Sequence, residues 1–178
     1  MESHYTFPEH IHRYAVWTAA RAVQRSFTTT QIIQNAINGS DLPQFLNHPL
    51  SDQEAFNDWH KATAQQLINN FGGEKVCSYG RAAKIIAIYL KTAWVIRHPE
   101  DDAVSAVIHP PIDRILLQNL AKTEKYQGLR GLSKENWTSF SGMRYWEIVD
   151  LIRHETNSFN WKLERFWEPA TLVENENY

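Results

Sequence analysis

Cysteine, long apolar runs and net charge are all scarce in this sequence. The one cysteine, Cys77, excludes disulfides within the chain and zinc sites made of several cysteines, and it fits a reducing cytoplasm. The main apolar stretch, AAKIIAIYLKTAWVI at 82–96, is interrupted by two lysines, so we expect no membrane-spanning segment. The start MESHYTFPEH is polar and is not a signal peptide. These shortages predict a cytoplasmic protein without a membrane partner.

The net charge of −2 argues mildly against a nucleic-acid partner, but the charges are unevenly spread. Residues 75–134 hold ten lysines and arginines against five acidic residues, whereas acidic residues dominate after 134. A nearly neutral protein can therefore still present one positive face. The alternative is that these charges only solvate helix surfaces.

The apolar pattern predicts an all-α fold. With 43% hydrophobic and 21% charged residues, the chain is globular, and 178 residues suit one domain over 1–178 with a loose tail at 168–178. Apolar spacing and capping signals predict a compact bundle of about six to eight helices and no strand. The expected helices cover 9–26, 28–38, 51–71, 79–97, 111–122 and one or two within 142–166, with loops at 40–51, 98–111 and 126–140.

Lys84 is the first candidate functional residue, because it interrupts the apolar helix expected at 79–97. Burial of a lysine lowers its pKa, and the free amine is a nucleophile that forms Schiff bases. Lys84, Ile88 and Lys91 are spaced i, i+4 and i+7, so they share one helix face. In the simpler alternative, Lys84 extends its amine to the surface along a buried stem.

Asp113 is the second candidate. It follows Pro-Pro-Ile near the start of the next helix, where the helix dipole and free N–H groups favour an ionised carboxylate. A carboxylate beside an activated amine suits cleavage of a glycosidic bond in DNA. The carboxylate would stabilise the oxocarbenium-like sugar, and the amine would attack the anomeric carbon. Alternatively, Asp113 only caps the helix.

Two segments resemble DNA glycosylases of the helix-hairpin-helix superfamily. PIDRI at 111–115 resembles the Pro-Val-Asp element that carries their catalytic aspartate, and AAKIIAIYLK resembles the lysine helix of the archaeal 8-oxoguanine branch. The resemblance covers roughly residues 69–117. It implies that Lys84 is the Schiff-base nucleophile, Asp113 the catalytic carboxylate, Ile88 a base-pocket residue and Lys91 a second lysine. It implies no metal and no cofactor.

The chain departs from that superfamily at the hairpin. The hallmark Leu-Pro-Gly-Val-Gly is absent, and NNFGGEKVCSYGRA at 69–82 takes its place as a degenerate helix-hairpin-helix. Backbone N–H groups around such a turn could bind a DNA phosphate. Arg114 also follows Asp113 directly, where the usual motif has a spacer.

A glycosylase must hold an extruded base and grip the DNA backbone. Trp17 and Tyr79 are further candidates for the base pocket. The candidate phosphate-binding residues are Lys75, Arg81, Lys122, Lys125, Arg130 and Lys134. The expected partner is DNA with a modified base. The resemblance suggests 8-oxoguanine, but Ile88 replaces an aromatic base contact. The chain also resembles small bacterial proteins with a similar N-terminal segment, and such proteins often lie in defence loci. By that association, a hypermodified phage pyrimidine, such as glucosylated hydroxymethylcytosine in an antiphage role, is the second candidate.

Three functions are alternatives to a DNA glycosylase: a ribonuclease toxin, a metal enzyme and a non-enzymatic binding module. No arginine precedes a histidine at the spacing of helical ribonuclease toxins. The histidines at 10, 12, 60 and 154 form no i, i+4 pair typical of a metal site. The main alternative is a non-enzymatic helical module that binds DNA or protein. We expect a monomer in either case.

Overall fold

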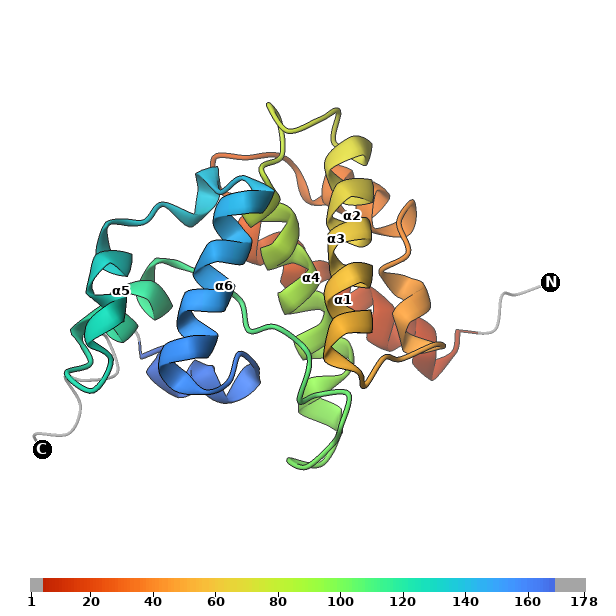
Figure 1. Ribbon diagram of the computed structural model, residues 1–178. Helices are drawn as coiled ribbons and strands as arrows, with labels where there is room; N and C mark the ends of the chain where they lie inside the picture. Colours follow the sequence, from red (N-terminus) through yellow and green to blue (C-terminus); the bar gives the residue numbers. More distant parts are fainter. Residues whose placement is uncertain (1–4, 169–178) are drawn as a thin grey trace, which may run out of the picture.

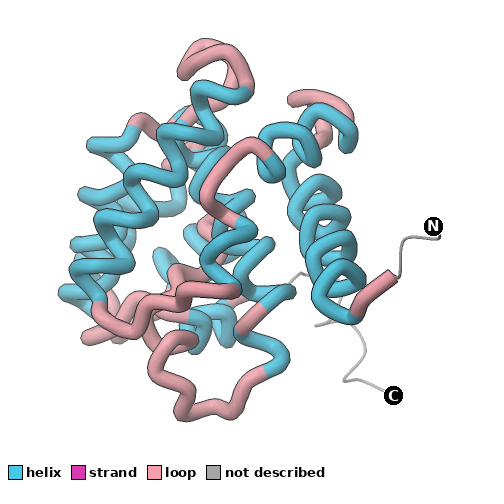
Figure 2. Tube along the Cα trace, turned by 90° about the vertical axis from the view of Figure 1, so that its right-hand side faces the viewer, coloured by secondary structure: helices cyan, strands magenta, loops and turns pink. Residues whose placement is uncertain are grey.

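The computed structural model describes residues 5–168, and over this range the chain consists of helices and loops without a β-strand (Figure 2). The all-α prediction is confirmed. None of the helices in this range has the length and apolar character needed to cross a membrane. The tail expected to be loose lies, from residue 169 onward, outside the described residues. The α-helices are α1 Phe7–Val23, α2 Thr30–Asn38, α3 Gln53–Asn70, α4 Tyr79–Ala93, α5 Arg114–Lys122 and α6 Gly142–Thr156.

Helix α4 is the central element, and it packs against α1, α3 and α6 (Figure 1). Eleven of its fifteen residues are buried, as expected for a helix that is apolar on all sides. The closest packing is with α1, which presents Ala15, Ala19 and Ala20 to the core, and these small residues let the two backbones approach. Because α4 carries Lys84, this arrangement places the lysine in the interior.

The turn between α3 and α4 depends on two glycines. Gly72 and Gly73 have φ of +96° and +108°, values that side-chain-bearing residues rarely adopt. Their N–H groups donate to the carbonyl oxygens of Asn69 and Ile68, both at 2.9 Å, and so end α3. A helix, a tight turn and a second helix therefore occupy the segment expected to form the degenerate hairpin. Whether this turn binds DNA stays a prediction.

Several expected helix ends need correction. Helix α3 is capped by Asp52 rather than Ser51, because Asp52 Oδ1 accepts from the N–H of Ala55 at 2.8 Å. Helix α4 ends at Ala93 and not at 97, since the backbone turns away at Trp94. The range 142–166 holds two helices, as expected. Helix α6 ends at Thr156, where Asn157 adopts a left-handed conformation with φ +60°, and a 3-10 helix follows at Trp161–Phe166.

Five short 3-10 helices lie within the described residues: η1 Pro43–Leu46, η2 Val95–Arg97, η3 Gln127–Lys134, η4 Trp137–Ser139 and η5 Trp161–Phe166. Three of them, η1, η3 and η4, occupy stretches that were expected to be loop, whereas η2 and η5 lie within ranges expected to be helical. Buried apolar side chains hold several of them to the core, including Phe45 in η1, Leu129 and Leu132 in η3 and Leu163 in η5. Isolated apolar residues do not give a helical period, so sequence pattern alone missed η1, η3 and η4.

Candidate functional site

Lys84 and Asp113 lie together, with the lysine Nζ 3.3 Å from the carboxylate Oδ2. The side chains are only 9% and 14% exposed. Both residues sit near the starts of helices: Lys84 is in the second turn of α4, and Asp113 immediately precedes α5. The two groups that the sequence singled out are therefore within reach of a single sugar ring.

Asp113 is the N-cap of α5 rather than a residue of its first turn. The expected helix start at 111 is wrong, since α5 begins at Arg114. Pro110 and Pro111 restrict the preceding backbone, and Asp113 itself is extended, with φ −144° and ψ 179°. Its Oδ1 accepts from the N–H of Leu116 at 3.0 Å, which satisfies one orphan donor of the helix start.

The other carboxylate oxygen of Asp113 has two donors. Besides Lys84 Nζ, the indole Nε1–H of Trp167 donates to Oδ2 at 2.8 Å. Trp167 comes from the segment after η5, fifty-four positions away in the sequence. Three donors from three separate segments thus fix the carboxylate, and this fits an ionised acceptor.

A glycine determines what covers the amine of Lys84. Gly80 lies one turn before Lys84, and a Cβ atom there would stand 1.9 Å from the carbonyl oxygen of Trp137. The N–H of Gly80 also donates to the carbonyl of Phe140 at 3.2 Å. Helix η4 can therefore dock directly on the start of α4. This contact brings the Trp137 ring to Lys84, with Nζ 4.4 Å from the ring centroid.

The surroundings of Lys84 act on its pKa in opposite directions. Burial lowers the pKa of the amine, and the charge and hydrogen bond of Asp113 oppose that effect without cancelling it. The amine thus loses its proton more readily than an ordinary surface lysine. An amine with a lowered pKa is suited to nucleophilic attack on an electrophilic carbon.

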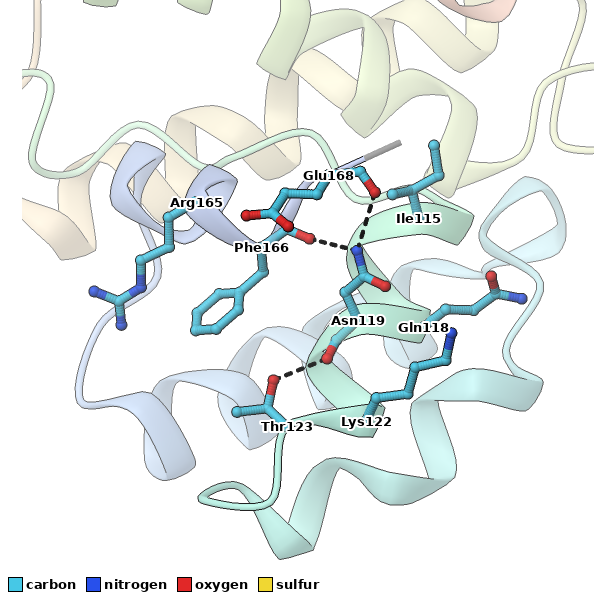
Figure 3. A pocket seen from close by; sticks show the side chains of 8 residues that line it. All are labelled: Ile115, Gln118, Asn119, Lys122, Thr123, Arg165, Phe166 and Glu168. Atoms are coloured by element: carbon cyan, nitrogen blue, oxygen red, sulfur yellow. Dashed lines mark hydrogen bonds between the residues drawn. The ribbon is translucent and has the colours of Figure 1, made fainter. Parts of the chain in front are cut away.

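Two hollows border α5, and neither is lined by Lys84 or Asp113. One, of about 320 Å³, adjoins Trp137 and is lined mainly by polar side chains of α5, η3 and the segment after it. Its lining is Arg114, Gln118, Ser133, Lys134, Glu135, Asn136 and Trp137. The other, of about 470 Å³, lies between α5 and the end of η5, with Lys122 and Arg165 on its walls (Figure 3).

Ile88 and Lys91 continue the face of α4 that carries Lys84, but they have other partners. Ile88 is half-buried and packs against the core. Lys91 forms an ion pair with Glu164 of η5. Lys91 therefore ties the C-terminal part of the chain to α4, and its charge already has a partner.

The structure places Tyr79 and Trp17 away from the amine and carboxylate. Tyr79 is buried, and its hydroxyl accepts from Trp146 Nε1–H at 2.9 Å and contacts His60 Nδ1 at 3.2 Å. Trp17 lies on the outer face of α1, 52% exposed and stacked on Tyr14. It borders a separate hollow with Arg13, Val16, Thr30 and Gln34. Neither side chain contacts Lys84 or Asp113 in this structure.

The candidate phosphate-binding residues fall into two groups. Lys122, Lys125, Arg130 and Lys134 are all exposed on α5, on η3 and on the turn between them, the unit that begins at Asp113. Lys75 is exposed in the α3–α4 turn, and Arg81 lies over the ring of Phe27 with its Cζ 4.7 Å from the centroid. Of the first group, Lys122 and Lys134 line the two hollows beside α5. The second group lies in the turn between α3 and α4 and at the start of α4.

His60 is not part of a metal site with other histidines of the N-terminal half. It is fully buried beside His109, with ring centroids 5.0 Å apart. Among residues 5–168, no group of three or more His, Cys, Asp or Glu side chains is arranged to hold a metal ion.

Trp167 is the one residue at the pair that sequence reasoning did not find. It stands beside the segment expected to be loose, and no spacing rule links it to a residue fifty-four positions earlier. Trp137 carries no local sequence signal of its own. A signal that could have pointed to its place is Gly80, a glycine inside a strongly helical pattern, which often marks a close backbone approach.

Comparison of the chain with protein-family profiles, with curated protein sequences and with solved structures finds no match in any of the three. The function is therefore inferred from the residues of the site.

Proposed function

We propose that this protein is a DNA N-glycosylase that uses Asp113 and Lys84 to remove a modified base. The observation that carries the proposal is the 3.3 Å approach of a largely buried lysine amine to a capped carboxylate. Few structural roles require an amine with a lowered pKa at such a position, and perturbed titratable groups gather at functional sites. The resemblance of 79–91 and 111–115 to glycosylase motifs supports the same assignment.

The chemistry follows from the charges of the two groups. As the bond between C1′ and the base nitrogen breaks, positive charge develops on the sugar, and the Asp113 carboxylate stabilises it. The Lys84 ammonium passes a proton to the departing base, and the free amine then forms a bond to C1′. Opening of the sugar ring gives a Schiff base, the route to strand cleavage. If water attacks in place of the amine, the product is an abasic site without cleavage.

The surroundings supply what a DNA substrate needs. The exposed basic residues of α5 and η3 lie on the unit that Asp113 begins, and they can contact backbone phosphates on either side of an extruded nucleotide. The polar hollow next to Trp137 offers amide, hydroxyl and charged groups to the edge of a base or to its substituent. 8-Oxoguanine and a hypermodified phage pyrimidine remain the two substrate candidates.

One observation favours a different function. Both carboxylate oxygens of Asp113 accept hydrogen bonds within the protein. A carboxylate that caps a helix and pairs with a lysine can have a purely structural role. In that case the chain is a non-enzymatic helical module that binds DNA or protein through its basic face. The two functions differ in whether Asp113→Asn changes chemistry or only stability.

The test is base release, measured by mass spectrometry on plain duplex DNA, 8-oxoguanine duplex and phage DNA with modified pyrimidines. Asp113→Asn should abolish release while the fold is retained, because asparagine also caps helices well. The matched control is Asp52→Asn, the same change at the N-cap of α3. Release that persists in Asp113→Asn, or its absence on every DNA despite binding, would reject the glycosylase.

The amine has its own test. Borohydride traps a Schiff base as a covalent protein–DNA adduct, and Lys84→Gln should remove that adduct. Lys61→Gln is a suitable control, because Lys61 also lies over a tryptophan ring, that of Trp146 at 5.0 Å, and also pairs with an aspartate. An adduct that maps to another lysine would exclude Lys84 as the nucleophile.

A further inference from the structure

The hydrogen bond from Trp167 to Asp113 is not used by any step of the proposed chemistry. It nevertheless occupies Oδ2, the oxygen that also faces the amine. With Asp113 and Lys84 both nearly covered, a deoxyribose that reaches the two groups has to displace something. The two candidates for displacement are the tryptophans on either side, Trp137 and Trp167.

Of these two tryptophans, Trp167 is the one free to move. The position of Trp137 is fixed by the close packing of its backbone on α4. Its carbonyl oxygen contacts Gly80 so closely that there is no room for a Cβ atom at Gly80. Trp167 is 40% exposed and follows the last turn of η5. Displacing Trp137 would require α4 and η4 to separate, whereas displacing Trp167 requires only that the chain beyond η5 swing away.

Residues 161–168, here called the C-terminal strap, are anchored by apolar side chains up to Phe166 and end in two exposed residues. Leu163 is buried in the core, and the partly buried ring of Phe166 packs against the core as well. In addition, Asn119 Nδ2 donates to the carbonyl oxygens of Phe166 at 2.8 Å and Glu168 at 3.4 Å (Figure 3). Glu164 pairs with Lys91. These polar contacts lie near solvent, where ion pairs contribute little and are readily exchanged.

We propose that Trp167 is the access residue of the Lys84–Asp113 site. In the DNA-free protein its indole N–H holds the carboxylate oxygen that the sugar must face, and the strap moves outward when DNA binds. A backbone phosphate that approaches Lys91 competes with Glu164 and so loosens the strap as the substrate arrives. The inference rests on the proposed function for the identity of the substrate, but its test does not.

The test measures how fast an amine-acylating reagent modifies Lys84, read by mass spectrometry of the Lys84 peptide. Trp167→Ala should raise that rate about tenfold, the effect of losing one hydrogen bond to a charged group. Trp167→Phe keeps a ring without the N–H and should give a smaller rise in the same direction. Asn119→Ala should also raise the rate, because it frees the strap without altering the indole. Asn35→Ala, the same substitution at an exposed asparagine of α2 whose side chain accepts a hydrogen bond from Gln31, is its matched control and should leave the rate unchanged.

Cys77 reports whether a variant merely loosens the whole fold. Its thiol is fully buried, and burial raises its pKa to about 12, so thiol reagents reach it only when the structure opens. A rise at Lys84 with Cys77 unchanged supports the access role. An unchanged Lys84 rate in Trp167→Ala and Asn119→Ala, or a parallel rise at Lys84 and Cys77, overturns it.

Failure of this inference can be told apart from failure of the glycosylase. If no DNA releases a base but Lys84 becomes accessible in the strap variants, the access role stands and the glycosylase is rejected. If a base is released in an Asp113-dependent manner but Lys84 labelling does not respond to the strap, the glycosylase stands and Trp167 is only a structural contact.

Discussion

His60 and His109 lie side by side in the core with their ring planes tilted by 42°, and each places its Nδ1 against a tyrosine hydroxyl. The contacts are 3.2 Å from His60 to Tyr79 and 3.0 Å from His109 to Tyr145. Within the described residues, neither Nε2 atom has a hydrogen-bond partner. Such a pair is stable only while both rings are neutral, since a charge there would be buried without a counter-ion.

We predict that the protein loses stability in mild acid because of these two histidines. Burial, with a smaller contribution from Lys61, lowers the pKa of His60 from 6.5 to about 3, and burial lowers that of His109 well below 6.5. The unfolded chain therefore binds more protons than the folded one below pH 6.5. Each histidine should remove about 1.4 kcal/mol per pH unit, so stability present at pH 7 is lost progressively as the pH falls from 6.5 towards 3.

Urea unfolding at pH 7.5 and pH 5 measures this effect. His109→Gln should reduce the loss of unfolding free energy per pH unit by about 1.4 kcal/mol, the contribution of one proton. The same change also lowers stability at pH 7.5. His154→Gln is the control, because the His154 side chain is 84% exposed, and it should leave the slope unchanged. A slope that is equal in all three proteins would mean that the buried pair does not determine acid sensitivity.

We expect Gly80→Ala to destabilise the protein and displace η4, although the substitution adds only one methyl group. The added methyl group would meet the Trp137 carbonyl oxygen, a backbone atom, so η4 must shift away from α4. The cost should be about 1–3 kcal/mol or more in the free energy of unfolding, as for other overpacked positions. Gly131→Ala is the matched control, since nothing lies within 4 Å of a Cβ atom there. Similar melting temperatures for the two variants would show that η4 is not seated on Gly80.

The Lys84–Asp113 pair should show strong coupling in a double-mutant cycle. Lys84→Met leaves a largely buried carboxylate without its counter-ion, and we expect a loss of about 2 kcal/mol. Asp113→Asn keeps the cap and should cost less. The double variant should be more stable than the sum of the single effects implies, by about 1 kcal/mol or more. Additive effects in urea unfolding would indicate that the two groups do not interact in solution.

Salt dependence of DNA binding tests the basic face of α5 and η3. The observed DNA-binding constant K falls as the salt concentration rises, and the plot of log K against log salt has a negative slope. If Lys122, Lys125, Arg130 and Lys134 contact phosphates, each change to glutamine should make that slope less negative by about 0.9. Lys162 is exposed and pairs with Glu100 outside this group, so Lys162→Gln should leave the slope unchanged. Equal slopes for all five variants would place the DNA elsewhere.

Sequence pattern predicted most of the helices because each depends on local features: apolar period, capping side chains and glycines. It also selected Lys84 and Asp113, since an amine in an apolar helix and a carboxylate behind two prolines are unusual in themselves. The 3-10 helices η1, η3 and η4 were missed because few apolar contacts hold them, and these carry no period. The start of α5 was misplaced because the capping bond of Asp113 outweighed the helix-starting tendency of Pro111.

The surroundings of the pair could not be predicted by the same reasoning. Tyr79 was expected in the base pocket, but its hydroxyl is hydrogen-bonded to Trp146 and His60 in the core. Trp167 approaches Asp113 only because η5 folds back along α5, a long-range relationship that chain-local patterns do not encode. Contacts between distant segments determine which tryptophan covers a site, and seven tryptophans gave no basis for choosing among them.

The two oxygens of Asp113 have different partners, and this determines how the carboxylate responds to a positive charge nearby. Oδ1 is held by the backbone of α5, so in the proposed glycosylase reaction Oδ2 would exchange an indole or ammonium partner for a cationic sugar while the carboxylate itself stays still. Little reorganisation energy is then needed when the charge appears, which is the condition under which a fixed dipole or ion lowers a barrier most. The hydrogen bond from Leu116 to Oδ1 therefore fixes the position of Asp113, whichever group is bound to Oδ2.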